Sequence, residues 1–496
     1  MSDVLDPMPS APIIDRQAVT VDHLIDGIDS GLGEREQAAL RAQIATLIDQ
    51  LGQGSLQTFA DTEAMLSARI ADIDALLSAQ VNEIIHAPEF QRLEASWRGL
   101  HYLVDQTDVG PTLKVRVLHV SKDDLRKDLE TASEFDQSAL FKKIYEDEYG
   151  MFGGEPFAAL IGDYDFGRHP QDIALLERIS NVAAAAHAPF LSAASPALFG
   201  WDSFAELSAP RDLAKIFTSA EYVKWRAFRE SEDARYAGLV LPRILLREPY
   251  TFWTVQVESF NFQEDTDGAD HRRFLWGNPA YAFGGRLADA FARYRWCAMI
   301  RGVDGGGLVE GLAIPPFRTD ADRVAARSPV EIDVSDLREK ELADLGFIPL
   351  VHCKGTDYAV FSSTQSCQKP KRYDSDEANA NARLSMQLQY ILATSRFAHY
   401  LKVMMRDKTG RVTTVRECER FLNDWLATYC MGNPESASFE ARARRPLRAG
   451  NVTVHEVKGK PGSYEAVVHL QPHFQLDELT VSLRLITELP SPVEGR

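Results

Sequence analysis

Apolar residues near the start of the chain recur at helical spacing. One stripe has intervals of three, four and seven residues and comprises Phe59, Leu66, Ile70, Ile73, Leu77, Val81 and Ile84. Pro88 ends this helix and opens a second, whose stripe comprises Phe90, Leu93, Trp97, Leu100 and Val104. Because a narrow stripe on a long helix needs a packing partner, the pattern predicts a partner helix from this chain or from another.

The middle of the chain alternates short apolar runs with helical patterns. Strands are predicted at 113–117, 157–161, 190–194, 238–246, 347–352 and 358–362. Helices are predicted at 171–186, 280–299 and 379–406, and Ser121 with Asp124 forms the capping box of another. This alternation predicts an α/β (mixed α+β) fold with a partly parallel, covered sheet core and flanking helices.

The C-terminal part changes to alternating β patterns. Residues 452–457 and 464–470 flank a Gly-Lys-Pro-Gly turn and predict a β-hairpin. One further strand carries Leu479, Val481, Leu483 and Leu485 on one face. We therefore divide the chain into an N-terminal arm and linker (1–57), an α/β region (58–378) and a C-terminal helical and β-hairpin region (379–496).

Composition and charge restrict the partners and the compartment. Among 496 residues, 54 Lys and Arg face 72 Asp and Glu, a net charge of −18 that disfavours nucleic acid. The acidic N-terminus resembles no signal peptide, and the longest apolar run is too short to insert into a membrane. Five cysteines without a CxxC pair predict reduced thiols in a cytoplasm.

No stretch of the sequence resembles a reaction centre. The glycine-rich run at 302–311 lacks the Lys and Ser/Thr of a phosphate-binding loop, and a tight turn is the favoured interpretation. Asp163, Asp165 and His169 follow a predicted strand and could ligate a metal, but turn chemistry explains them better because no second cluster accompanies them. The sequence predicts no catalytic residue, cofactor or metal.

The two ends of the chain point to assembly. The last strand carries an apolar face close to the C-terminus, and a bare strand edge is prone to aggregate unless something covers it. Twenty extended residues of the arm, including Ile13 and Ile14, reach roughly 70 Å and could add a strand to a neighbouring subunit. The alternative, a disordered arm and an internally paired last strand, explains the pattern equally well.

Long stretches of the sequence resemble the TssC/VipB family, the large subunit of the type VI secretion contractile sheath. The resemblance covers about 88–489 and includes Trp97-Arg-Gly-Leu-His-Tyr-Leu103, Phe152-Gly-Gly-Glu-Pro156, Leu160-Ile-Gly-Asp-Tyr164, Trp276-Gly-Asn-Pro-Ala-Tyr-Ala-Phe283, Arg301-Gly-Val-Asp-Gly-Gly-Gly-Leu-Val-Glu-Gly311 and His473-Phe-Gln-Leu-Asp-Glu-Leu479. The first 60 residues are similar only in general character.

The resemblance implies a structural protomer and not an enzyme. It implies pairing with the small subunit TssB/VipA, self-polymerisation as a helical tube around an inner tube of Hcp, attachment to a baseplate, and disassembly by the ATPase ClpV. Contraction would propel tube, spike and effectors into a target cell from a cytoplasmic sheath anchored to the envelope through the baseplate. A sheath of a related phage-tail-like injection machine and a cytosolic α/β enzyme remain the alternatives.

The resemblance also suggests roles for particular residues. Inter-protomer strands are expected at Ile13 and Ile14 and at Leu479, Val481, Leu483 and Leu485. ClpV recognition is expected on a short helix presenting Leu24, Ile25 and Ile28, unless that helix only packs within the sheath. The basic helix that carries Lys402 and Arg406 is the candidate to face the inner tube.

Overall fold

The computed structural model of the chain describes residues 38, 42, 62–149, 151, 153–209, 211–251, 260–266, 271–314, 316–318, 324–326, 328–408, 414–433, 436–456 and 464–473. Contacts divide the chain into two compact units, Met1–Leu77 and Ser78–Arg496. The division at 57 and 378 rests on sequence pattern and stays a prediction.

Helices make up most of the regular structure. They are α3 (Thr62–Ile85), α4 (Pro88–Asp105), α5 (Lys122–Thr131), α6 (Ala139–Phe141), α7 (Asp147–Tyr149), α8 (Pro170–Ala186), α9 (Leu213–Ile216), α10 (Val223–Glu230), α11 (Ala280–Tyr294), α12 (Asp336–Asp344), α13 (Asp376–Leu384), α14 (Leu388–Lys408), α15 (Val415–Ala427) and α16 (Phe439–Arg444). The strands are β1 (Leu160–Phe166), β2 (Phe190–Ala194), β3 (Ala237–Leu241), β4 (Ile244–Leu245), β5 (Trp276–Gly277), β6 (Leu308–Val309), β7 (Pro316–Arg318), β8 (Val324–Ala326), β9 (Phe347–His352), β10 (Ala359–Phe361), β11 (Leu447–Glu456) and β12 (Tyr464–Pro472).

A six-stranded mixed sheet organises the second unit. Its strand order is β1-β2-β3-β9-β10-β6. The first four strands run parallel, with Ala193 opposite Val240 between β2 and β3, and β10 is antiparallel to both β9 and β6. Parallel strands need crossover connections, and α8 supplies the one between β1 and β2. The predicted α/β class with a partly parallel sheet is confirmed.

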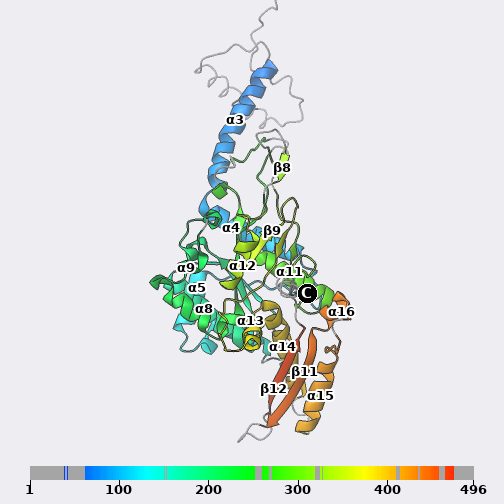
Figure 1. Ribbon diagram of the computed structural model, residues 1–496. Coiled ribbons are helices and arrows are strands. Elements are labelled where there is room, and N and C mark those ends of the chain that lie inside the picture. The colour runs from blue at the N-terminus through cyan, green and yellow to red at the C-terminus, as the bar shows by residue number, and fades with distance from the viewer. Residues whose placement is uncertain are drawn as a thin grey trace, which may run out of the picture. The chain divides into compact units, whose positions relative to one another are not determined.

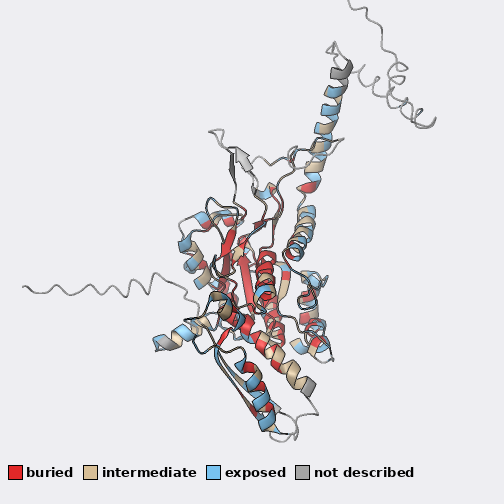
Figure 2. Ribbon diagram, turned by 90° about the vertical axis from the view of Figure 1, so that its right-hand side faces the viewer, coloured by how far each residue is buried: buried red, intermediate tan, exposed pale blue. Residues whose placement is uncertain are grey.

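Helices cover both faces of this sheet, and β2, β3 and β10 are buried along their whole length (Figures 1 and 2). Side chains alternate between faces along a strand, so Leu239 and Leu241 of β3 join the core under α8 and α10, whereas Val240 joins the core under α11 and α14. A strand buried on both faces must be apolar at every position, which explains the continuous run in β3.

Local signals explain where several helices begin and end. Pro88 and Pro170 occupy the first turns of α4 and α8, where a missing N–H costs no hydrogen bond. The Ser121 hydroxyl accepts a hydrogen bond from the Asp124 amide at the start of α5, as the capping box predicts. At the end of α11, Arg295 adopts a left-handed conformation and stops the helix, so the predicted extension to residue 299 is wrong.

Four strand or helix predictions also need correction. The predicted strand at 113–117 forms no ladder among the described residues; the side chains of Lys114 and Arg116 form ion pairs with Glu155 and Glu148. The predicted strand at 238–246 is interrupted at Pro242, which has no N–H to donate.

The predicted helix at 379–406 splits into α13 and α14, since the Leu388 amide donates to the Thr364 carbonyl and not to a helical turn. The strand predicted at 157–161 lies instead at β1.

A buried ion-pair cluster ties α4 to the segments around Arg247 and Glu264. Arg247 Nη1 and Nη2 lie 2.5 and 3.1 Å from the two oxygens of Glu264, and its Nε lies 2.8 Å from Glu94. The Tyr250 amide also donates to Glu264. The side chains of Arg247 and Glu264 are only 7% and 1% exposed, so removing one charge leaves the other buried and poorly solvated.

We expect Glu264→Gln to lower the free energy of unfolding by about 3 kcal/mol, near the lower end for broken buried pairs because Glu94 still faces Arg247. Urea titration followed by tryptophan fluorescence measures the change. The matched control is Glu221→Gln, whose ion pair with Arg168 is exposed and contributes less than about 1 kcal/mol. Equal midpoint shifts for the two variants would show that the buried cluster contributes no more than a surface pair.

Candidate assembly surfaces

The residues considered for metal binding serve as turn and cap groups. Asp163 accepts a hydrogen bond from Ser96, Asp165 lies 3.8 Å from Arg243, and the His169 ring accepts the Gln171 amide at the start of α8. Burial raises the pKa of Asp165, which disfavours the charged form that a metal ligand needs. Across the described part of the chain, no group of three or more His, Cys, Asp or Glu side chains could hold a metal.

The glycine-rich run at 302–311 forms a turn that leads into β6, the last strand of the sheet. The Gly302 amide donates to Phe361, and Gly307 exchanges backbone hydrogen bonds with Gly302 and Phe361. A Cβ at position 307 would lie 2.5 Å from the Phe361 carbonyl oxygen, so only glycine fits there. The glycines therefore serve the close approach of backbone to backbone, as the turn interpretation predicts.

Two neighbouring histidines, the half-buried His187 and the buried His399, have strongly lowered pKa values. Burial lowers the pKa of His187 to about 4 and that of His399 to about 3. His399 Nε2 lies 3.0 Å from the Ala186 carbonyl, and the His399 ring packs 6.2 Å from that of His187. Perturbed groups often mark active sites, but burial is the main cause here and both imidazoles are neutral core members at neutral pH.

The predicted stripe of α4 lies on the surface. Phe90, Leu93, Trp97 and Val104 are exposed, and Trp97 keeps 67% of its accessible surface. The helix buries the opposite positions Gly99 and Leu103 against α11. Gly99 sets this orientation, because a Cβ there would lie 2.4 Å from the Tyr281 ring. An exposed apolar stripe of this size marks an interaction surface.

The C-terminal hairpin stands on a third apolar core. β11 and β12 pair with Val452 opposite Val468, and α15 lies alongside them (Figure 1). Val452 and Val454 are buried with Cys418, Leu422 and Leu426 of α15. Gly450 permits this close packing, since a Cβ at that position would lie 2.7 Å from the Leu426 side chain. The predicted hairpin is confirmed.

The outer edge of β11 is already bound by α15. Asn423 Nδ2 donates to the Val452 carbonyl at 2.7 Å, and its Oδ1 accepts the Val452 amide at 2.9 Å. Two residues further along β11, the Val454 amide donates a hydrogen bond to the Glu419 carboxylate. Because alternate residues of a strand direct both backbone groups to the same side, these contacts occupy the edge that faces away from β12. No further strand can pair with β11 there.

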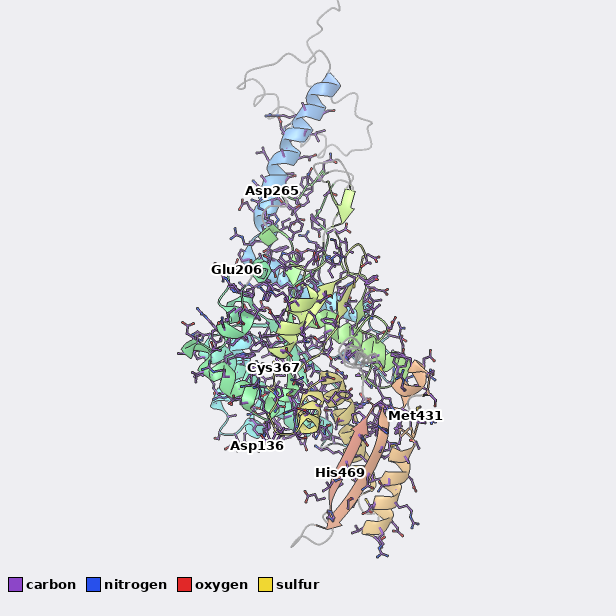
Figure 3. The ribbon with its side chains drawn as sticks, in the orientation of Figure 1. Asp136, Glu206, Asp265, Cys367, Met431 and His469 are labelled. Carbon is purple, nitrogen blue, oxygen red and sulfur yellow. The ribbon has the colours of Figure 1, made fainter. Side chains whose placement is uncertain are left out.

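The outer edge of β12 is open within the described residues. Val468 and Ala466 lie opposite Val452 and Val454, so their backbone groups also point away from the hairpin. No hydrogen bond from elsewhere in the described chain reaches them. The strand is mostly apolar between Glu465 and His469, and it contains no lysine or internal proline to discourage pairing (Figure 3 labels His469).

Most of the predicted site residues lie outside the described residues. These are Ile13 and Ile14 of the arm, Leu24, Ile25 and Ile28 of the expected ClpV helix, and Leu479, Val481, Leu483 and Leu485 of the last strand. Lys402 and Arg406 are described and lie on α14. The Lys402 ammonium packs over the rings of Tyr145 and Tyr149, and Arg406 donates to the Met151 carbonyl.

Sequence reasoning missed the side chain that binds the outer edge of β11. Asn423 lies on the polar side of an amphipathic helix and resembles any solvent-exposed residue in the sequence. Its role depends on a strand 29 positions later, which no local pattern reveals.

Comparison with known proteins identifies the family. A covered sheet, an exposed apolar stripe and an open strand edge describe a subunit whose function lies in its contacts with other chains. Residues 67–368 match the EvpB/VC_A0108 tail sheath N-terminal domain (VipB), and residues 377–489 match the EvpB/VC_A0108 tail sheath gpW/gp25-like domain. The chain belongs to this VipB/EvpB tail sheath family, whose members are structural proteins and not enzymes.

A curated relative covers nearly the same length. The type VI secretion system sheath protein TssC1 of Pseudomonas aeruginosa is 48% identical over 464 residues, 93% of each chain. The resemblance to the TssC/VipB family is therefore confirmed, and the enzyme alternative is excluded.

Solved structures with similar arrangements come from the anti-feeding prophage. Its baseplate matches 74% of this chain and 81% of that chain with a TM-score of 0.36 and 9% identity. The structure of its contracted helical sheath matches 60% of this chain and 63% of that chain, with a TM-score of 0.28 and 12% identity.

Within the described residues, no helix combines the length and the apolar character that crossing a membrane requires.

Asn423→Ala should release the outer edge of β11. Buried backbone groups of Val452 then lose their partners, which we expect to cost about 2 kcal/mol of folding stability and to speed hydrogen exchange at the Val452 amide. Hydrogen–deuterium exchange with mass spectrometry measures the second effect. Asn451→Ala is the control, because Asn451 is exposed and bonds only to Thr453. Unchanged exchange at Val452 would contradict the proposed capping by Asn423.

Proposed function

We propose that the chain is the large protomer of a type VI secretion contractile sheath. The observation that carries this proposal is the hairpin with one edge bound by α15 and one edge open, in a member of a tail sheath family. A curated relative at 48% identity bears the type VI secretion name, which favours this system over a related phage-tail-like injection machine. The sheath lies in the cytoplasm and is held at the envelope through a baseplate.

The chain acts together with a small sheath subunit of the TssB/VipA type. Heterodimers polymerise as a helical tube around an inner tube of Hcp, and contraction of the sheath propels the tube, spike and effectors into a target cell. The ATPase ClpV then disassembles the contracted sheath. In this proposal the exposed stripe of α4 packs against the small subunit, because burying Trp97 and its apolar neighbours removes a large apolar area from water.

Strand exchange joins neighbouring protomers. The open edge of β12 accepts a strand from the arm, at Ile13 and Ile14, or from the last strand, at Leu479, Val481, Leu483 and Leu485. Each added strand contributes several backbone hydrogen bonds, with a net of roughly 0.5–1.5 kcal/mol apiece. A donor on one subunit and an acceptor on the next form a heterologous contact, which generates an open helix when the rotation does not close.

The remaining residue roles stay proposals. The ClpV-recognition helix at Leu24, Ile25 and Ile28 rests on the sequence alone. The tube-facing role of Lys402 and Arg406 rests on their positive charge, and the contacts of both side chains with the 145–151 segment count against it. Contraction itself needs no nucleotide in this proposal, because its energy is the difference between two packings of one lattice.

Val468→Pro tests the strand-accepting edge. The Val468 amide points away from β11. Proline at this position therefore removes a hydrogen-bond donor for the incoming strand but removes no hydrogen bond between β11 and β12. We expect the variant, co-expressed with the small subunit, to form heterodimers but no tubules in negative-stain electron microscopy.

Val468→Thr is the matched control, because it keeps the amide and a β-branched side chain and should still give tubules. Hydrogen exchange across 447–456 reports whether the hairpin of the proline variant is intact. Normal tubules with Val468→Pro, in the presence of an intact hairpin, would contradict strand acceptance at this edge. Absence of tubules from the unaltered pair would contradict the sheath function as a whole.

Leu93→Asp tests the α4 stripe as the small-subunit surface. A buried, unpaired carboxylate in an apolar interface is costly, so we expect the affinity for the small subunit to fall at least about 100-fold. Co-purification and surface plasmon resonance measure the change. Leu118→Asp is the matched control, because Leu118 has a similar exposure, 51% against 57%, but lies off the stripe. Equal losses for both variants would place the small subunit elsewhere or indicate a general folding defect.

A further inference from the structure

A small cavity lies beside the middle of α14, where two apolar cores meet. Leu388 and Ile391, in the first turns of the helix, belong to a core under the central sheet, whereas Phe397 and Leu401 belong to the core of the C-terminal hairpin. The cavity has a volume of about 10 Å³, which is close to the least that one water molecule needs and excludes larger ligands. It is lined by Ala158, Phe291, Cys297, Leu392, Arg396 and His399.

His399 brings an unsatisfied hydrogen-bond acceptor to this cavity. The residue is only 2% exposed, and its Nε2 lies 3.0 Å from the Ala186 carbonyl. Because a carbonyl oxygen only accepts, Nε2 carries the ring proton. Burial lowers the pKa of His399 to about 3, so the ring is neutral and Nδ1 offers a lone pair. Within the described residues this buried Nδ1 has no hydrogen-bond partner, which costs free energy unless a donor reaches it.

Arg396 supplies a donor from the same face of α14, three residues earlier in the helix. Its guanidinium lies over the rings of Phe291 and Tyr400, 5.5 and 4.6 Å from their centroids, and its Nη2 donates to the Tyr400 hydroxyl. These contacts orient the guanidinium, yet its Nε is buried without a hydrogen-bond partner in the described part of the chain. A donor and an acceptor therefore border one cavity without bonding to each other.

Cys297 offers a third, weaker partner. Its thiol donates to the Leu287 carbonyl at 3.5 Å, and burial raises its pKa to about 12, so the thiol keeps its proton. The sulfur still accepts a weak hydrogen bond. A water molecule here accepts from Arg396 and donates to His399 and Cys297, which matches the roughly three hydrogen bonds that a buried water makes. An anion fits less well, since the lone pair of the His399 ring repels it.

We propose that the cavity holds one ordered water molecule, which bridges Arg396 Nε and His399 Nδ1 and anchors α14 between the two cores. The His399 ring also bonds to Ala186 at the end of α8, so the bridge connects α14 to a helix that covers the sheet. Because α14 carries residues of both cores, this anchor links the packing of the hairpin to that of the sheet. The inference does not depend on the proposed strand exchange, and its failure would leave the sheath function untouched.

A crystal structure or cryo-EM map of the full chain that resolves ordered water tests the site directly. We expect a single peak within about 2.7–3.2 Å of both Arg396 Nε and His399 Nδ1. A direct hydrogen bond between the two side chains, or an empty cavity with both side chains unmoved, would overturn the proposal. An anomalous signal at the site after bromide replaces chloride would identify an anion and would also overturn it.

Hydrogen exchange along α14 tests the bridge in solution. His399→Phe removes the acceptor, and Arg396→Lys keeps the positive charge but removes the Nε–H, so each variant leaves the other buried atom unsatisfied. We expect each to speed the exchange of α14 amides at least about ten-fold. Because both changes break the same bridge, the double variant should exchange about as fast as His399→Phe alone. Independent effects would instead multiply to about a hundred-fold.

Two controls separate the bridge from general packing. His399→Gln should keep most of the protection, because its amide group donates to Ala186 and accepts from the water. His187→Phe alters a ring 6.2 Å from that of His399 that does not line the cavity, so its effect should multiply with that of Arg396→Lys. Slow exchange of the β3 amides shows that a variant still folds.

A dry cavity predicts a different result for Arg396. Its Nε would then be an unsatisfied buried donor, and Arg396→Lys would leave exchange unchanged or slow it. That outcome would contradict the bridge, as would effects of His399→Phe and Arg396→Lys that multiply in the double variant.

Discussion

The need of a strand edge for hydrogen-bond partners is the constraint on which the proposed assembly depends. In the C-terminal hairpin this need is met on one side only, where Asn423 and Glu419 bind the backbone of Val452 and Val454. The other side, along Val468 and Ala466, is open within the described residues. An isolated two-stranded ribbon is marginally stable in water, so α15 both supports the hairpin and removes one of its two edges. Growth of the sheet is thereby limited to a single direction.

The central sheet has the opposite character. Helices cover both of its faces, and its strands β2 and β3 are buried along their whole length, so its stability depends on its own core. The Arg247–Glu264 pair adds a polar contact that specifies how α4 and the neighbouring segments meet. A close-packed body of this kind moves as a unit. A sheath that changes its packing needs such bodies joined by connections that survive the movement, and in the proposed assembly strand exchange is that connection.

The sequence predicted the buried elements well and the surfaces less well. Residues 190–194 and 347–352 form strands at the predicted bounds because continuous apolar runs have few alternatives in a covered sheet. The run at 113–117 alternates equally well but forms no ladder, since alternation shows only that one face is wet and not that a neighbouring strand exists. The break between α13 and α14 depends on the distant Thr364 carbonyl. The stripe of α4 was recognised as apolar, but whether Gly99 or Trp97 faced the core depended on the Tyr281 ring, which lies 182 positions from Gly99.

Backbone hydrogen bonds alone give an open strand edge little selectivity. Every extended backbone offers the same donors and acceptors, so an exposed edge that relied on them would also accept the wrong strand. Copies of a chain with a net charge of −18 repel one another in general, and this repulsion disfavours random encounters between open edges. The net charge therefore opposes the aggregation that an open apolar strand edge invites.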